Sequence, residues 1–361
     1  MNAPRLVTAA VGSLSLFAGT SIAQVTVTLE PSRDVTLFED TSGRALANGA
    51  GSQFCVGVDA AGRRKRGVLA FDVSGIPSAA TITSVSLQVV IAMNIDYSPR
   101  DSGLHRVTQD WGEAGSLSVP GLGGGQCGGG APMAGDATWT HTFFPGSTWA
   151  TPGGDFDATA SATTSVGITV GAAATWASTA QLVADVQGWV TTPGTNFGWL
   201  MLGDESLSPT ARAFFTREDA TAAQRPQLTV TYDEPTAAIA SVGTGCSGSG
   251  ASNLSLQASG LPQVPNPSFS VSLSGGPAGP IRGYALSFAL SPVPIPLGGG
   301  CSIFVGLPFA TIIPALGPTL PLPVPNNPDL LGASFPLQGL ALDAAPTLFV
   351  TSNALNLTFG R

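Results

Sequence analysis

Short runs of alternating apolar and polar residues constrain the fold of this chain more than any other feature. Residues 25–29 and 82–89 alternate with a period of two, and residues 67–73 form a more continuous apolar run. Alternation is typical of a half-buried strand, and a short continuous run is typical of a central strand in a sandwich. Turn residues separate these runs at intervals compatible with a sandwich. The sequence therefore predicts an all-β fold.

Composition supports the same prediction. The chain has 361 residues, of which 43% are hydrophobic, enough for about two domains with cores of their own. Its 46 glycines and 29 prolines suit short strands and turns, because these residues cost about 1 and 3 kcal/mol in a helix relative to alanine. The net charge is −8 and charged residues make up only 10% of the chain. Without a basic stripe, we expect no nucleic-acid partner.

The N-terminus predicts export. Arg5 precedes an apolar stretch over residues 6–17, and Ser21-Ile22-Ala23 forms a small-x-small cleavage site before Gln24. This pattern indicates a signal peptide over residues 1–23, although a buried N-terminal helix is the alternative. Elsewhere no run of about 20 apolar residues occurs, so we expect no membrane span once the signal is removed. The predicted location is secreted, extracellular or at the cell surface.

Changes in composition divide the rest of the chain. We predict a first β-sandwich over residues 24–233, a linker over 234–242 and a Gly/Pro-rich β-sandwich over 243–361, both jelly-roll-like. The Pro-rich stretch 312–329 is expected to be a long ordered loop or an edge, and residues 348–359 a final strand.

One segment of the first module has a helical period. Its apolar residues recur on one helix face: Leu182, Val183, Val186, Trp189 and Val190. Ser178 is the expected N-cap, and Pro193-Gly194 is expected to stop the helix. We predict one short helix that covers an edge or end of the sandwich.

The four cysteines fall into two pairs along the chain. Cys55 and Cys127 lie early, and Cys246 and Cys301 lie late. Four cysteines allow three connectivities, and pairing within each module is the simplest because it needs no docking between modules. An oxidising compartment permits such bridges. The spacings do not match those of a zinc site.

Segments spread over most of residues 34–232 resemble the DNRLRE family, which is related to alginate-type carbohydrate-binding modules of secreted bacterial proteins. They are Asp34-Val35-Thr36-Leu37-Phe38-Glu39, residues 66–77 (RGVLAFDVSGIP), Leu104-His105-Arg106-Val107-Thr108, Asp110-Trp111-Gly112-Glu113, residues 183–189, residues 196–200, Phe215-Thr216-Arg217-Glu218 and residues 225–230. Residues 243–250 (GTGCSGSG), followed by Cys301, resemble a planctomycete-type secreted C-terminal module. The resemblance implies a secreted β protein that binds polysaccharide or attaches to the cell envelope.

Four residues are candidates for contact with a polysaccharide. Trp149 lies in a loop-rich stretch with His141 nearby, and an exposed indole there can stack on a sugar ring; the alternative is a tryptophan that plugs the end of the sandwich. In the basic run Arg63-Arg64-Lys65-Arg66, Arg64 and Arg66 share one face of a strand and can bind uronate carboxylates. A solvated strand edge is the alternative. Arg217-Glu218 and Arg225 are expected to form ion pairs or backbone ties.

Carboxylates offer a metal site or catalysis. Asp155 and Asp157 can share a loop, where the alternatives are turn capping, calcium binding and acid/base catalysis. Calcium is the cofactor we consider; otherwise we expect none. Asp204 with Glu205 and Glu218 with Asp219 are sequence neighbours, which point to opposite faces of a strand. The chain has only two histidines, His105 and His141, and no serine in a nucleophile elbow.

These observations favour a secreted, non-catalytic surface or matrix protein whose first module binds polysaccharide. A purely structural envelope component without a ligand is the alternative, and a polysaccharide-degrading enzyme is a third hypothesis.

Overall fold

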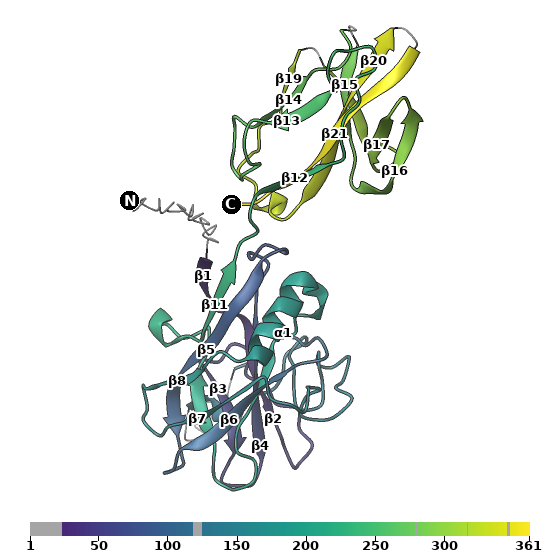
Figure 1. Cartoon of the computed structure of the whole chain (residues 1–361). Coiled ribbons are helices and arrows are strands. Elements are labelled where there is room, and N and C mark those ends of the chain that lie inside the picture. Colours follow the sequence, from purple (N-terminus) through teal and green to yellow (C-terminus); the bar gives the residue numbers. More distant parts are fainter. Residues whose placement is uncertain (1–23, 118–124, 279–280, 316, 345–346) are drawn as a thin grey trace, which may run out of the picture.

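The structure, a computed structural model, describes residues 24–117, 125–278, 281–315, 317–344 and 347–361. The predicted signal peptide lies outside these residues. The described chain is all-β with a single α-helix, and every pair of neighbouring strands is antiparallel. The first module and the Gly/Pro-rich second module are joined by one connecting stretch, as Figure 1 shows.

The first module is built on one large sheet with the strand order β1-β11-β5-β10-β3-β4-β9-β6-β7, in which β2 also pairs with β4 and β8 with β5. Its strands are β1 (Gln24–Leu29), β2 (Pro31–Phe38), β3 (Gln53–Val58), β4 (Arg64–Phe71), β5 (Thr81–Asn94), β6 (Arg100–Arg106), β7 (Ala162–Val166), β8 (Ala173–Trp176), β9 (Trp199–Leu202), β10 (Arg212–Phe215) and β11 (Gln227–Asp233). Leu69 of β4 and Leu87 of β5 belong to one buried core although their strands are not neighbours. The two halves of the sheet therefore pack face to face, as in a sandwich.

The single helix, α1 (Ala180–Thr191), covers this core. Leu182, Val186 and Trp189 point into it and are fully buried, as the helical period predicts. The N-cap is Thr179, whose hydroxyl accepts a hydrogen bond from the Leu182 N–H, so the expected cap at Ser178 is wrong. The Ser178 hydroxyl instead accepts a bond from the Val85 N–H on β5, which anchors the helix entrance to the sheet.

A second apolar cluster lies on the outer face of β2, β4 and β9. Val35, Val68 and Leu200 point outward there and are buried beneath tryptophans of a long connecting segment. This segment, residues 107–157, is called the cover segment below. Because the cover segment buries the outer face, β4 is covered on both sides. The continuous apolar run at residues 67–73 has its physical explanation in this double burial.

The second module is a smaller sandwich. A five-stranded sheet, β12-β21-β20-β15-β18, and a three-stranded sheet, β13-β14-β19, face one another across a core, and β16 pairs with β17 in a hairpin. The strands are β12 (Ala238–Val242), β13 (Ser255–Ala258), β14 (Ser270–Ser274), β15 (Arg282–Leu286), β16 (Leu290–Gly298), β17 (Cys301–Val305), β18 (Thr311–Pro314), β19 (Thr319–Pro321), β20 (Ser334–Ala344) and β21 (Thr347–Thr358). The Pro-rich stretch supplies β18 and β19, which are edge strands, where the missing N–H of proline is tolerated.

The connection between the modules is shorter than the sequence predicts. Residues 238–242 form β12, which pairs with β21 along its whole length, because Ile239 has an apolar side chain that packs on the second core. The expected linker 234–242 is therefore reduced to residues 234–237. Short one-turn helices are η1 (Gly125–Gly128), η2 (Pro193–Thr195), η3 (Ala222–Gln224) and η4 (Pro328–Leu330).

Both predicted disulfides are confirmed. Cys55 on β3 bonds to Cys127 of the Gly-rich loop, and Cys246 bonds to Cys301 at the start of β17. Each bridge lies within one module. The part of the chain that the structure describes contains no helix of the length and apolar character that a membrane span needs.

We predict that replacing Cys55 and Cys127 together by alanine lowers the free energy of unfolding of the first module by about 4 kcal/mol, because the bridge closes a long loop in the unfolded chain. The sequence separation is 72 residues. Urea unfolding followed by tryptophan fluorescence measures this loss, since all six tryptophans lie in this module. A midpoint equal to that of the wild type would contradict the prediction.

Candidate functional site

The basic run 63–66 places its side chains alternately on the two faces of β4. Arg64 and Arg66 lie in the same row as Val68, on the outer face, and both stack on the ring of Trp139, at 5.1 and 5.0 Å. Arg63 and Lys65 both bind Asp59 instead. The predicted division of the run into two faces is confirmed.

Arg64 is the more exposed of the two arginines. Its Nε and Nη2 donate to the two carboxylate oxygens of Glu39, at 2.9 and 2.6 Å, and 42% of the side chain is exposed. Its Nη1 has no hydrogen-bond partner among the described residues. The bond from Arg64 is the main cause that lowers the pKa of Glu39. Arg64 is thus held in place while one edge of its guanidinium faces solvent.

Arg66 is a structural arginine. It binds both oxygens of Glu205, at 2.8 and 2.9 Å, and its Nη1 donates to the Gly153 carbonyl. Its guanidinium also lies over the ring of Phe156. Gly153 has a φ of +97°, and a Cβ there would lie 2.6 Å from the arginine. The close approach therefore requires glycine.

The two arginines line one side of a groove with a volume of about 730 Å³. This surface is called the arginine groove below, and its lining is Arg64, Arg66, Thr108, Gln109, Ala150, Thr151, Pro152, Gly154, Asp155 and Phe156. All of these residues except the arginines come from the cover segment. The groove therefore forms where the cover segment stops covering β4.

Trp149 and His141 do not line this groove, and the burial of Trp149 corrects the expectation that its indole is exposed. Trp149 is only 4% exposed, and its Nε1 donates to the Thr138 carbonyl at 2.9 Å. The indole fills the space between the cover segment and the sheet, so its face is not open to a sugar. His141 bonds through Nδ1 to the Thr140 hydroxyl and packs edge-on against Phe144.

The carboxylates of Asp155 and Asp157 both have partners within the protein. Both oxygens of Asp155 accept backbone N–H groups, from Ala150 and Thr151 at 2.7 and 2.9 Å. The Asp157 carboxylate pairs with Arg106 at 2.9 Å. Asp155 thus shapes the turn that forms the groove wall, in agreement with the turn-capping alternative.

The other carboxylate pairs diverge as well. Asp204 binds Arg100, whereas Glu205 binds Arg66. His105, which packs against Phe156, bonds through Nδ1 to the Asp157 carbonyl. Arg225 forms an ion pair with Glu30, as expected for a structural arginine.

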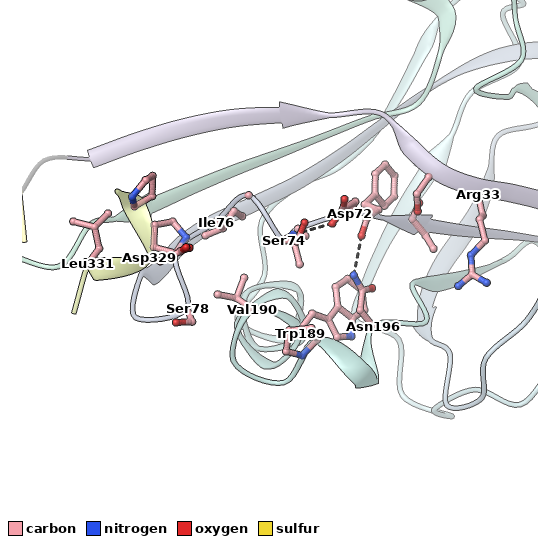
Figure 2. Close-up of a pocket in the computed structure, with 18 residues that line it drawn as sticks. Arg33, Asp72, Ser74, Ile76, Ser78, Trp189, Val190, Asn196, Asp329 and Leu331 are labelled. Atoms are coloured by element: carbon pink, nitrogen blue, oxygen red, sulfur yellow. Dashed lines mark hydrogen bonds between the residues drawn. The ribbon is translucent and has the colours of Figure 1, made fainter. Parts of the chain in front are cut away.

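A second cavity lies at the junction of the modules. It has a volume of about 630 Å³ and is bounded by residues 72–78, by Trp189 of α1 and by residues 328–331 (Figure 2). Asp72 accepts a bond from the Ser74 N–H there, and Asn196 donates to the Phe71 carbonyl. These polar groups hold the local backbone, and none of the predicted site residues lines the cavity.

The partners that make the groove have no signal in the sequence. Trp139, Phe156 and Gln109 belong to no motif or period that marks them as site residues. The pairs Glu39–Arg64 and Glu205–Arg66 join residues 25 and 139 positions apart. A two-residue spacing identifies which arginines share a face, but not which distant carboxylate meets them.

Comparisons with known proteins add no identification. No family model matches the chain, and a search of curated proteins finds no match. The resemblance to the DNRLRE family and to the planctomycete-type module therefore stays a prediction from the residues.

We predict that Arg66→Ala lowers the free energy of unfolding by about 2–4 kcal/mol, because it leaves a largely buried Glu205 carboxylate without its partner. The matched variant Arg64→Ala should cost less than about 1 kcal/mol, since its pair is partly exposed. Urea unfolding of both variants measures the difference. Equal losses of unfolding free energy in the two variants would contradict the prediction.

The Glu39–Arg64 pair should stabilise the fold in a pH-dependent way. Glu39 has a lowered pKa in the folded chain, so its contribution is fully present above its ordinary pKa of 4.5. It is lost as the pH falls through the lowered folded value. The stability difference between the wild type and Glu39→Gln should therefore be constant from pH 7 to about pH 5 and shrink below. Urea midpoints of both proteins, measured from pH 7 to below the pKa of Glu39, test this prediction. A stability difference between the wild type and Glu39→Gln that grows in acid would be inconsistent with the pair.

Proposed function

We propose that this chain is a non-catalytic, exported surface or matrix protein whose first module binds acidic polysaccharide in the arginine groove. The observation that carries the proposal is the position of Arg64. Its guanidinium is stacked on Trp139, tied on one edge to Glu39 and open on the other. It is thus held in place before any ligand arrives, which reduces the entropy lost on binding.

The chemistry of the groove suits a polyuronate. A guanidinium binds a carboxylate with strong, directional hydrogen bonds. Thr108, Gln109 and Thr151 line the groove with groups that can bond to sugar hydroxyls. Phe156 adds an aromatic surface on which the apolar face of a sugar ring can pack.

The proposed location follows from the predicted signal peptide and the disulfides. Structural disulfides persist in oxidising compartments outside the cytosol, and both modules contain one. The second module carries little charge. Its proposed role is contact with the cell envelope, as the resemblance implies.

A structural component without a ligand is the second candidate. It is favoured by the charge pairing of the two arginines, which Glu39 and Glu205 already neutralise, and by Asp155, which adds a carboxylate to the groove. A polysaccharide-degrading enzyme has less support. A lyase usually needs a base such as Tyr, His or Lys, and the described residues that line the groove include none of these.

Affinity electrophoresis of the full mature chain tests the proposal. Gels with alginate or polygalacturonate should retard the wild type, and Arg64→Ala should weaken this binding at least about tenfold, the equivalent of one charge-assisted hydrogen-bond pair.

Two controls separate binding at the groove from general charge effects. Arg44→Ala removes an exposed arginine paired with Asp40 outside the groove, and it should leave retardation unchanged. A neutral glucan in the gel should not retard any variant. Absence of retardation on every polyuronate would favour the ligand-free structural component, and release of unsaturated or reducing ends would favour the enzyme.

A further inference from the structure

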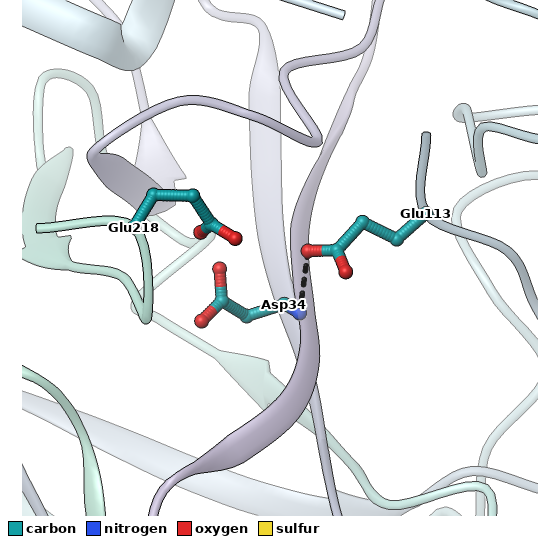
Figure 3. A group of neighbouring side chains, drawn as sticks. All are labelled: Asp34, Glu113 and Glu218. Atoms are coloured by element: carbon teal, nitrogen blue, oxygen red, sulfur yellow. Dashed lines mark hydrogen bonds between the residues drawn. The ribbon is translucent and has the colours of Figure 1, made fainter. Parts of the chain in front are cut away.

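Three carboxylates from distant parts of the first module meet beside β2. Asp34 lies on β2, Glu113 in the cover segment, and Glu218 just after β10. Each offers one oxygen, and these three oxygens lie within 4.8 Å of one another. Figure 3 shows the carboxylates of Asp34 and Glu218 pointing toward each other. Glu113 approaches from the opposite side, where it accepts a hydrogen bond from the backbone N–H of Asp34.

The charges of this cluster do not cancel within the described residues. Arg217 is its ion-pair partner and binds Glu113 at 2.6 Å and Glu218 at 2.9 Å. When all three carboxylates are ionised, one guanidinium leaves two negative charges. A single divalent cation would balance them.

Two oxygens in the cluster also lack partners. Asp34 is 1% exposed; its Oδ2 accepts the Arg217 N–H at 2.8 Å, but Oδ1 has no hydrogen-bond partner among the described residues. Oε2 of Glu218 is buried and unpartnered in the same sense. A buried acceptor without a donor costs about 1–3 kcal/mol, and more when it is charged. Both unpartnered oxygens belong to carboxylates that face each other.

We propose that Asp34, Glu113 and Glu218 bind one divalent cation, and that calcium is the ion that fits. The donor set is entirely oxygen, which excludes a preference for zinc or copper. Three oxygens within 4.8 Å of one another are close enough to share one ion, and calcium accepts carboxylate sets of flexible geometry, whereas magnesium demands a near-ideal octahedron with shorter contacts of about 2.1 Å.

The ion would join three segments at a point away from the Cys55–Cys127 bridge, which already links the cover segment to β3. Glu113 belongs to the cover segment and Asp34 to the strand that it covers, while Glu218 follows β10, which lies between β5 and β3 in the same sheet. A bound cation would lie between these carboxylates and fix the cover segment to the sheet.

Calcium uptake by the full mature chain tests the proposal. After treatment with EDTA and equilibrium dialysis in about 2 mM calcium, a range in which extracellular sites bind, the wild type should retain one calcium per chain. Its melting temperature should rise by at least about 3 °C, as expected when a ligand exceeds its Kd several-fold. Magnesium at the same concentration should give a smaller shift.

Glu218→Gln is the main variant because it keeps the shape of the side chain and removes one charge. We expect it to weaken calcium binding at least about tenfold, since affinity follows the charge of the ligand set. Glu30→Gln is the matched control, because Glu30 is also paired with an arginine but lies outside the cluster. It should bind as the wild type does.

Each outcome decides the proposal. The absence of calcium uptake by the wild type would overturn it and would mean that Asp34 and Glu218 share a proton instead. Uptake that Glu218→Gln leaves unchanged would place the ion elsewhere and overturn it too. If Glu218→Gln does not fold, the calcium stoichiometry of the wild type still decides. Glu113→Gln then serves as the second variant: bound terbium is detected by its tryptophan-sensitised luminescence, and calcium should displace it only at higher concentration than in the wild type.

Discussion

Burial of β4 on both faces is the constraint on which the rest of the first module depends. Leu69 and Phe71 point into the sandwich core, and Val68 points outward, where water would meet it if the cover segment were absent. Val35 and Leu200 lie on the same outer face, so this side of the sheet is apolar. The cover segment and its tryptophans supply the missing apolar partner. The arginine groove lies where this cover ends and Arg64 projects beside Trp139.

Local patterns predicted the features that depend on neighbours in sequence. The period-two runs predicted strands, the helical period predicted α1, and the spacing of Arg64 and Arg66 predicted that they share a face. The disulfides followed from the division of the cysteines between two modules. The cap of α1 was misplaced by one residue, because Ser178 and Thr179 are equally good caps in sequence and only the sheet decides between them.

Features that depend on contacts between distant segments were not predictable in this way. Trp149 lies in a loop by pattern, yet the outer face of the sheet needs an apolar cover and takes its indole. Asp155 lies in a loop of the kind that can bind calcium, yet both of its carboxylate oxygens accept hydrogen bonds from backbone N–H groups of its own turn. The converging carboxylates come from positions that are 79 and 105 residues apart along the chain. No period or spacing signals such a meeting, which only the register of the sheet produces.

Arg64, positioned by Trp139 and Glu39, is the group that we propose binds the ligand. The most direct test is an NMR titration of the arginine Nε–H signals of the full chain with an oligouronate. Arg64 should shift progressively and saturate, while Arg66, whose guanidinium is already bound on both edges, should shift much less. No shift at Arg64 while other arginines respond, or turnover of the oligosaccharide during the titration, would contradict the claim.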